Sequence, residues 1–264
     1  MTFRAAAIAG LVPLLGLTAC GESRQPPWKS SAPKGPPAAE ARYLAPPAIT
    51  EARGGDGGVQ LGGTAAPGAR VMLGTPSGET LSAQADAEGR WTVAAPTPRS
   101  VTLYGLFMQV DDRKVNAQGY LVLTPDGRAA ELRAGAGARV LAPGSRPPRI
   151  LAVDFDRDGG AVVSGVGTAR ADVGLRVNRT AGGTGAVTPE GRFSIPLARP
   201  LVSGRHEFEV AGEGGEDVVV VVTDRPAPLG EAVYRASAID AGWRIDWRTP
   251  GGGAQSTLLL VRRG

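Results

Sequence analysis

The chain repeats itself at a constant spacing of 102 residues. Residues 56–93 align without a gap with residues 158–195, so that Glu88-Gly89-Arg90-Trp91 corresponds to Glu190-Gly191-Arg192-Phe193. Solenoid repeats have periods of about 20–50 residues, whereas a spacing near 100 residues is the size of a whole domain. The sequence therefore predicts two copies of one small domain in tandem.

Each copy alternates hydrophobic and polar residues with a period of two. Val59 and Leu61 in the first copy, like Val173 and Leu175 in the second, face one side of an expected strand. Turn signals recur every 8–12 residues, and the 264 residues include 39 glycines and 22 prolines. No helical periodicity follows the N-terminal region. The pattern predicts an all-β fold of two sandwiches.

A set of small residues, turn residues and one aromatic residue in the first copy has a known counterpart. The positions are Gly63, Ala65, Pro67-Gly68, Val71, Ala85-Asp86, Gly89 and Trp91. Residues 63–96 thereby resemble bacterial Ig-like domains. The second copy keeps Gly165, Val173, Gly191 and Phe193 but has Ala169-Arg170 in place of Pro-Gly. The resemblance covers about 180 residues and implies two Ig-like β-sandwiches used as spacer or adhesive modules, without catalysis.

The boundaries follow from turn-rich and proline-rich stretches. We expect the first sandwich over residues 49–142, the second over 147–226 and a separate tail over 227–264. Residues 20–48 contain repeated Pro-Pro pairs among small and polar residues, which favours an extended polyproline II tether. Such a tether would hold the sandwiches away from the point where the chain is anchored.

The tail reads as a β-hairpin. Trp243, Ile245 and Trp247 alternate with charged residues, residues 250–253 are Pro-Gly-Gly-Gly, and an apolar run follows. A strand over 233–238 is expected to precede the hairpin. A lone hairpin is marginal in water, so we expect it to dock on the second sandwich with the tryptophans at least partly buried. The alternative is an exposed platform on which Trp243 and Trp247 stack sugar rings.

Cys20 is the only cysteine and ends the run Leu17-Thr18-Ala19-Cys20. Arg4 and an apolar stretch precede it, an order typical of a bacterial lipoprotein signal peptide over residues 1–19. Acylation of Cys20, including palmitate, would anchor the mature chain in the cell envelope. Gly21 follows Cys20, and the Asp that signals inner-membrane retention in enteric bacteria is absent, which favours the outer membrane, facing the periplasm.

The segment Asp154-Phe155-Asp156-Arg157-Asp158-Gly159 is the candidate metal site. Three carboxylates at alternate positions before a glycine suit Ca²⁺, which prefers oxygen ligands. Gly165 stands where a closing acid is expected, and Arg157 adds positive charge. The alternative is a polar strand that ends in an Asp-Gly turn, with no metal held tightly. No cofactor is expected.

Composition narrows the function classes further. The formal net charge is +4 and no run of five basic residues occurs, so no nucleic-acid partner is expected. A Ser-His-Asp triad would have to use His206, the single histidine. We therefore expect a non-enzymatic scaffold or protein-binding module whose partners are the membrane and envelope proteins. The alternatives are a carbohydrate- or peptidoglycan-binding module that contacts cell-wall glycan and, third, an envelope hydrolase.

Overall fold

The computed structural model describes residues 43–55, 57–141 and 146–261. Within these ranges the chain forms nineteen β-strands and no α-helix, which confirms the all-β prediction. A search of the same residues finds no helix long and apolar enough to cross a bilayer. Cys20, the signal peptide over 1–19 and most of the tether over 20–48 lie outside the described residues, so these assignments stay predictions.

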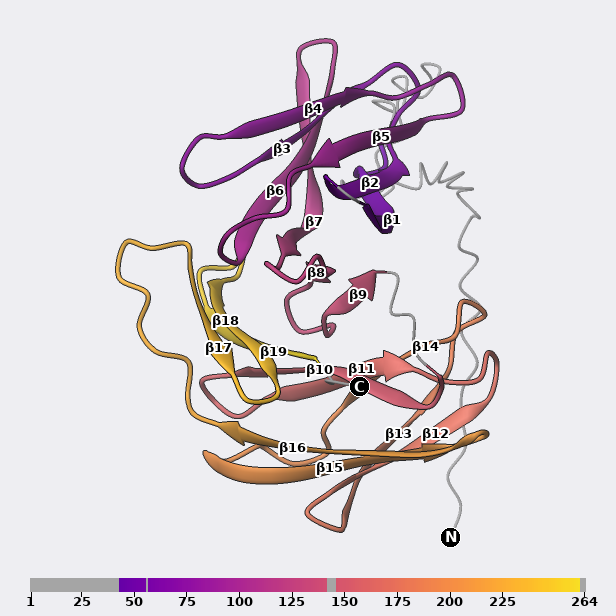
Figure 1. Ribbon diagram of the computed structural model, residues 1–264, viewed down its shortest axis with the longest axis vertical. Helices are drawn as coiled ribbons and strands as arrows, with labels where there is room; N and C mark the ends of the chain where they lie inside the picture. Colours follow the sequence, from indigo (N-terminus) through magenta and orange to yellow (C-terminus); the bar gives the residue numbers. More distant parts are fainter. Residues whose placement is uncertain (1–42, 56, 142–145, 262–264) are drawn as a thin grey trace, which may run out of the picture. The chain divides into compact units, whose positions relative to one another are not determined.

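The first copy of the repeat forms two antiparallel sheets (Figure 1). One sheet has the order β1-β2-β5 and the other has the order β4-β3-β6-β7, which β8 and β9 extend at its edge. These strands are β1 (Ala48–Gly55), β2 (Gly58–Thr64), β3 (Arg70–Gly74), β4 (Thr80–Gln84), β5 (Arg90–Ala95), β6 (Thr102–Val110), β7 (Arg113–Leu123), β8 (Ala129–Leu132) and β9 (Arg139–Leu141). Leu61, Leu73 and Trp91 meet between the two sheets in the first core.

The second copy forms a sandwich of the same kind. Its sheets have the orders β14-β11-β10 and β13-β12-β15-β16, and β19, β18 and β17 continue the first of these beyond β10. The strands are β10 (Arg149–Asp156), β11 (Ala161–Val166), β12 (Asp172–Val177), β13 (Thr180–Ala186), β14 (Arg192–Pro196), β15 (Gly204–Gly212), β16 (Gly215–Thr223), β17 (Tyr234–Ile239), β18 (Gly242–Arg248) and β19 (Ala254–Leu260). Val163, Phe193 and Phe208 lie in the second core.

The two copies match strand for strand. Arg70 begins β3 and Asp172 begins β12, while Thr102 begins β6 and Gly204 begins β15, so the spacing of 102 residues continues past the stretch that aligns by sequence. Seven antiparallel strands in a three-plus-four sandwich are the architecture of Ig-like and fibronectin-type domains. The strand order thus supports the tandem Ig-like sandwiches that the sequence predicts.

The conserved aromatic residue is buried at the same place in each copy, as predicted. Trp91 is 2% exposed and Phe193 is 3% exposed. Each follows a tight turn closed by a glycine amide, from Gly89 to the Asp86 carbonyl and from Gly191 to the Thr188 carbonyl. The turn returns the chain into β5 or β14, so the aromatic ring enters the core at once.

The tail differs from the expected hairpin docked on a finished sandwich. Its three strands belong to the sheet itself, because β19 pairs with β10 from Ala152, opposite Leu259, to Asp156, opposite Gln255. The edge of β10 would otherwise present unpaired amide and carbonyl groups, which a further strand satisfies. The Pro-Gly-Gly-Gly loop lies between β18 and β19, where the sequence places it.

The two sandwiches also share a third hydrophobic core, which we call the joint. Along β7, Leu121 and Leu123 point into the first core, whereas Val122 points into the joint. The joint contains Val101, Leu103, Val122, Ala130, Leu132, Ala138, Val140, Leu151, Ala152, Val166, Ile245, Trp247 and Leu259. The two copies therefore share a core, and the chain from Leu44 onward is one compact unit.

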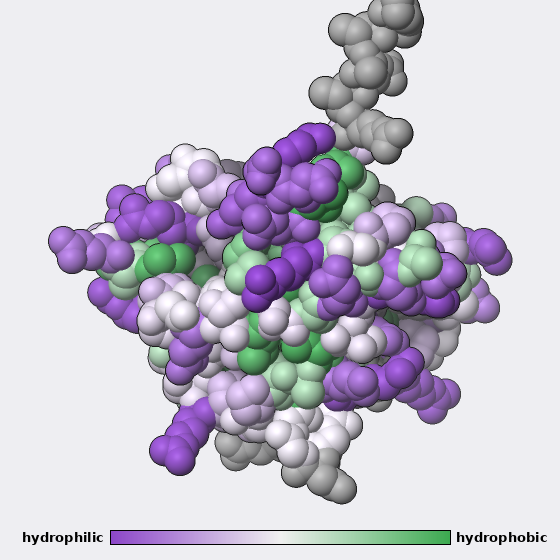
Figure 2. Space-filling model, turned by 90° about the horizontal axis from the view of Figure 1, so that it is seen from above, coloured by the Kyte–Doolittle hydropathy of each residue, from purple (hydrophilic) through white to green (hydrophobic). Residues whose placement is uncertain are grey.

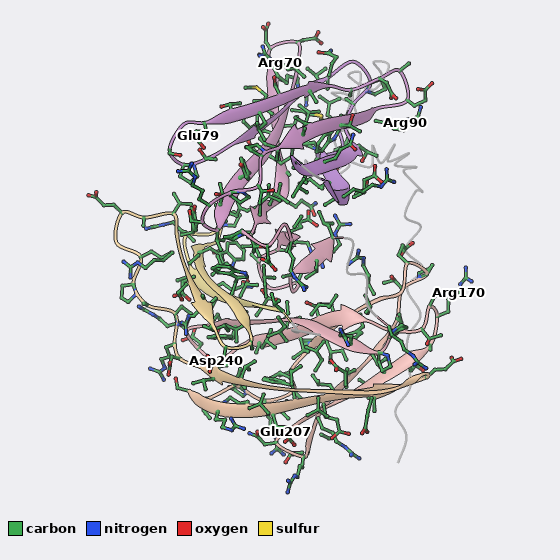
Figure 3. The ribbon with its side chains drawn as sticks, viewed as in Figure 1. Arg70, Glu79, Arg90, Arg170, Glu207 and Asp240 are labelled. Atoms are coloured by element: carbon green, nitrogen blue, oxygen red, sulfur yellow. The ribbon has the colours of Figure 1, made fainter. Side chains whose placement is uncertain are left out.

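Charged side chains project from the outer surface. Arg70, Arg90 and Glu207 point away from the sheets in Figure 3. On the face drawn in Figure 2, hydrophobic residues form only small patches between hydrophilic ones. The large hydrophobic side chains exposed in the described part of the chain are Tyr43, Val202, Val218 and Val222. The apolar surface of this face is too scattered to mark a partner by itself.

Candidate functional site

The two tail tryptophans lie at the joint. Trp247 is 0% exposed; its ring meets Tyr120 edge to face, with centroids 5.8 Å apart, and its Nε1 donates to Thr257 Oγ1 at 3.0 Å. Trp243 is half-buried, and its Nε1 donates to Asp126 Oδ1 at 3.0 Å. Trp247 therefore offers no ring face to a sugar, and the two rings do not make an exposed platform.

The three aspartates of the candidate calcium site do not converge. Asp154 is 1% exposed and lies within the fold, whereas Asp156 and Asp158 are exposed. Asp156 Oδ1 accepts hydrogen bonds from the amides of Asp158 at 2.9 Å and Gly160 at 2.8 Å, which is the geometry of a polar turn. Among the described residues, no three His, Cys, Asp or Glu side chains are grouped to hold a metal ion.

Asp154 ties the two sandwiches together. Its Oδ2 accepts a hydrogen bond from the amide of Ala138 at 2.7 Å, and its Oδ1 accepts from Thr257 and Gln255. Burial raises the pKa of Asp154 to about 6, although these three hydrogen bonds act in the opposite direction. A buried carboxylate that accepts from both copies makes the joint sensitive to its charge.

His206 is buried and fully engaged. Its Nε2 donates to the carbonyl of Val202 at 2.8 Å, and its Nδ1 accepts from Asn178 Nδ2 at 3.1 Å. A carbonyl oxygen only accepts, so Nε2 carries the proton. Asn178 is held in turn, because its Oδ1 accepts the amide of Glu207 at 2.9 Å. This arrangement is that of a structural histidine, and neither ring nitrogen faces a serine hydroxyl.

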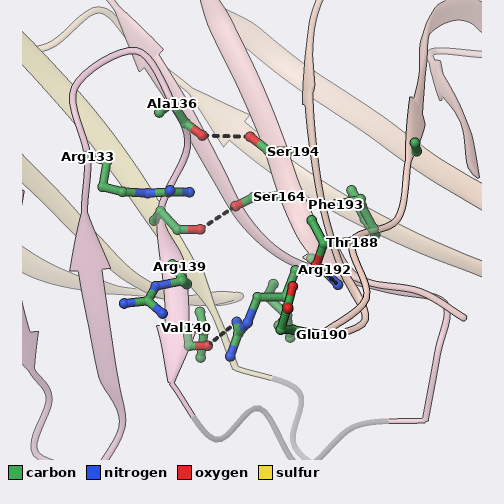
Figure 4. Close-up of a pocket in the computed structure, with 14 residues that line it drawn as sticks. Arg133, Ala136, Arg139, Val140, Ser164, Thr188, Glu190, Arg192, Phe193 and Ser194 are labelled. Carbon is green, nitrogen blue, oxygen red and sulfur yellow. Dashed lines mark hydrogen bonds between the residues drawn. The ribbon is translucent and has the colours of Figure 1, made fainter. Parts of the chain in front are cut away.

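A cleft beside the joint brings together arginine side chains of the two sandwiches. It has a volume of about 500 Å³ and lies between the β8–β9 connection of the first sandwich and strands β11 and β14 of the second (Figure 4). Three arginines line it: Arg133 and Arg139 from the first sandwich, and Arg192 from the second. We call it the arginine cleft.

Serine side chains hold the walls of the arginine cleft together. Ser194 Oγ donates to the carbonyl of Ala136 at 2.6 Å, and Ser164 Oγ donates to the carbonyl of Ala138 at 2.7 Å (Figure 4). Arg192 Nη1 donates to the carbonyl of Val140 at 2.6 Å. Alternate carbonyls of one segment are thus bound by side chains of the other sandwich. The cleft is therefore built into the fold.

The guanidinium groups repel one another. Arg139 has a carboxylate partner, with its Nε 2.9 Å from Glu131 Oε2. Burial lowers the pKa of Arg192, and the charges of Arg139 and Arg133 lower it further. Glu190 lies exposed on the rim. The cleft thus combines positive charge with N–H donors.

Sequence reasoning missed the arginine cleft. Arg133 follows β8, whereas Arg139 begins β9 and Arg192 begins β14, so the three lie up to 59 positions apart and no local pattern marks them. One signal was present in the repeat itself. Asp86 of the first copy corresponds to Thr188 of the second, at the start of the turn that precedes Arg90 or Arg192. This loss of an acid next to a retained arginine distinguishes the two copies.

The comparisons with known proteins identify no relative by sequence. No family model and no curated protein matches the chain. Several solved structures are similar to it. Three of them are the BSP domain of a biofilm-associated protein (18% identity, 70% of this chain and 30% of that one, TM-score 0.25), the bacterial integrin-binding protein invasin (14%, 82% and 54%, 0.20) and the central fibronectin-III array of RIM-binding protein (14%, 84% and 87%, 0.25).

The chain spans 30% of the length of the first of these structures and 54% of the second. With TM-scores this low, the description of the two sandwiches rests on their own strand order.

Proposed function

We propose that this chain is a lipid-anchored, non-enzymatic scaffold of the bacterial cell envelope that binds other envelope proteins. Its anchor would be Cys20, after removal of residues 1–19, and residues 20–48 would be the tether. Gly21 after the cysteine favours the outer membrane, facing the periplasm. The sandwiches would then meet partners in the periplasmic space.

The joint is the observation that carries the scaffold proposal. Two domains on a flexible linker change their separation freely, whereas a shared core fixes it. Polar contacts add to the core: Tyr234 Oη donates to the carbonyl of Val101 at 3.0 Å, and Trp243 Nε1 donates to Asp126. A unit of fixed geometry on a tether suits a role in holding a partner at a set place near a membrane.

The described side chains support a binding role over catalysis. His206 gives its ring nitrogens to Val202 and Asn178, so it has no free nitrogen with which to act as a general base. The arginine cleft has charge and donors, but the hydroxyl groups of Ser164 and Ser194 donate to backbone carbonyls within the fold. The proposal therefore assigns this surface to recognition.

Cell fractionation tests the anchor. Wild-type chain should sediment with the outer membrane, and Cys20→Ser should appear unprocessed or in the soluble periplasmic fraction. Ser30→Cys, which places a thiol in the tether with the motif intact, controls for the substitution itself. Unchanged size and membrane partition of Cys20→Ser would overturn the anchoring proposal.

Photo-crosslinking in intact cells tests the scaffold. A photo-crosslinking residue is placed at exposed Arg176 or at exposed Arg53 of the otherwise wild-type chain. Both positions should form discrete adducts, and with the same envelope proteins. Trp247→Ala, which opens the joint, should abolish adducts that depend on the spacing of both sandwiches while the chain stays in the membrane. Adducts that are identical with and without an intact joint would contradict the scaffold role.

A further inference from the structure

Arg90 and Arg192 occupy the same position in the two copies but have different partners. Arg90 Nε lies 3.1 Å from Asp86 Oδ2, and its Nη2 lies 3.1 Å from Glu88 Oε2. In the second copy Thr188 replaces Asp86, and Arg192 makes no ion pair with any residue that the structure describes. The second copy has kept the arginine and lost its main carboxylate.

This exchange removes charge without changing the turn. Asp86 Oδ1 accepts the amide of Arg90 at 2.7 Å, and Thr188 Oγ1 accepts the amide of Arg192 at 3.3 Å. The turn-closing bond from Gly191 to the Thr188 carbonyl, 2.9 Å, is also kept. Threonine keeps the bond to the arginine amide but not the bond that Asp86 Oδ1 also accepts from the amide of Glu88 at 3.0 Å. The larger difference lies in the guanidinium of Arg192, which lines the arginine cleft without an aspartate partner.

A second guanidinium in the cleft is also incompletely bonded. Arg133 donates from Nε to the carbonyl of Gly137 at 3.2 Å, and its Nη atoms have no partner among the described residues. Arg139 is neutralised by Glu131. Glu190, the only acid among the described residues of the lining, is exposed on the rim and accepts a hydrogen bond from Thr188. Arg133 and Arg192 thus supply unpaired charge from opposite walls.

We propose that the arginine cleft binds an oxyanion, a phosphate or carboxylate group of a small ligand, between Arg133 and Arg192. Guanidinium groups donate in pairs to both kinds of oxyanion, and such charge-assisted bonds are among the strongest in proteins. Repulsion between the three arginines is relieved when an anion enters. The site draws on both sandwiches, so its ligand would bind across them.

The dimensions suit a small ligand. Clefts that bind small molecules have volumes of about 300–1,000 Å³ and combine apolar walls with a few polar groups. Here the volume is about 500 Å³, and Val140, Leu151 and Phe193 supply apolar surface beside the arginines. The inference does not depend on the anchor or on protein partners, so either proposal can fail alone.

Calorimetric titration of the full chain, purified in a non-ionic detergent, tests the site with inorganic phosphate and with succinate as probes. We expect saturable binding of at least one anion. The probe that binds more tightly shows whether the natural ligand carries a phosphate or a carboxylate group. Arg133→Gln and Arg192→Gln should each weaken binding about tenfold or more. Arg176→Gln, which removes one charge from the exposed face of β12, should change the affinity less than twofold.

Thr188→Asp provides a variant that keeps the fold. It restores the residue that pairs with Arg90 in the first copy, so it should bind Arg192 internally and weaken anion binding at least tenfold, with an unchanged melting temperature. No saturable binding of either anion to the wild-type chain would overturn the proposal. Affinity that is unchanged in Arg192→Gln and Thr188→Asp would overturn it as well.

Discussion

Gly63 lies directly against the ring of Trp91: a Cβ atom added to the glycine would be 2.7 Å from Trp91 Cζ2. The two residues face each other across β2 and β5. The second copy repeats this contact, because a Cβ on Gly165 would be 2.7 Å from Phe193 Cζ. The glycine and the aromatic residue, 28 positions apart in each copy, are therefore one packing unit.

Gly63→Ala should destabilise the fold by about 1–3 kcal/mol or more, as overpacking does in well-filled cores. The new methyl group would also meet the carbonyl oxygen of Ala48, 1.9 Å away, so the backbone would have to move. Urea unfolding measures the loss. Gly54→Ala, on the neighbouring strand with no atom near its Cβ position, should stay within about 0.5 kcal/mol of wild type. Equal effects of the two substitutions would contradict this packing.

Trp247→Ala should cost about 3–5 kcal/mol, the range for removal of a large buried aromatic side chain. Since the joint draws residues from both sandwiches, hydrogen exchange should speed up in β7 as well as in β10. Val222→Ala, at a side chain that is 59% exposed, is the control and should change stability by less than about 0.5 kcal/mol. Faster exchange in the second sandwich alone would show that the joint does not couple the copies.

Local patterns in the sequence predicted the sandwiches well. The period of two along β2 and β12 and the turns that end in Gly89 and Gly191 are set by neighbouring residues, so one stretch of chain reveals them. Because the unit occurs twice in the chain, a pattern found in one copy can be checked in the other. The buried positions of Trp91 and Phe193 followed from this combination.

The joint and the arginine cleft depend on which surfaces meet, and local patterns do not carry that information. The alternation around Trp247 predicted an apolar face but not that residues of the first sandwich, such as Leu132, would cover it. Asp154 shares the residue type and spacing of Asp156, yet pairing with β19 turned it into a buried acceptor. The role of Thr188 becomes visible only when it is compared with Asp86, the equivalent residue of the first copy.

The segment from Asp154 to Asp158 should bind Ca²⁺ no more tightly than weak extracellular sites, with Kd no lower than about 10⁻⁴–10⁻³ M. The carboxylate oxygens of Asp154 accept hydrogen bonds from Ala138 and from residues of β19. Asp156 Oδ1 accepts hydrogen bonds from the amides of its turn. Calorimetry on chelator-treated full chain is the measurement, with Asp158→Asn for comparison. Micromolar binding that Asp158→Asn removes would show that the segment rearranges around calcium.

Asp154 should make the stability of the joint depend on pH. Its pKa is raised from 3.8 to about 6 in the folded chain, so folding favours the protonated acid. The stabilisation that the protonated Asp154 gives to the fold is therefore fully present below about pH 4. It is lost as the pH rises through about 6, and stability changes little above that. At 1.36 kcal/mol for each pKa unit, the loss is on the order of 2–3 kcal/mol at most.

Asp154→Asn should remove this pH dependence. The NH₂ group of the asparagine would face the donors Ala138 N, Thr257 and Gln255, and a donor cannot accept their hydrogen bonds. The variant should therefore be less stable than wild type at pH 4, by about 1–3 kcal/mol. The difference in unfolding free energy between wild type and Asp154→Asn should narrow as the pH rises to 7, because only the wild type acquires a buried charge. Urea unfolding from pH 4 to 7 measures it. Ser164→Ala removes another hydrogen bond to Ala138 but keeps the carboxylate, so its curve should run parallel to wild type. A constant difference between wild type and Asp154→Asn would mean that Asp154 keeps one charge state over this range.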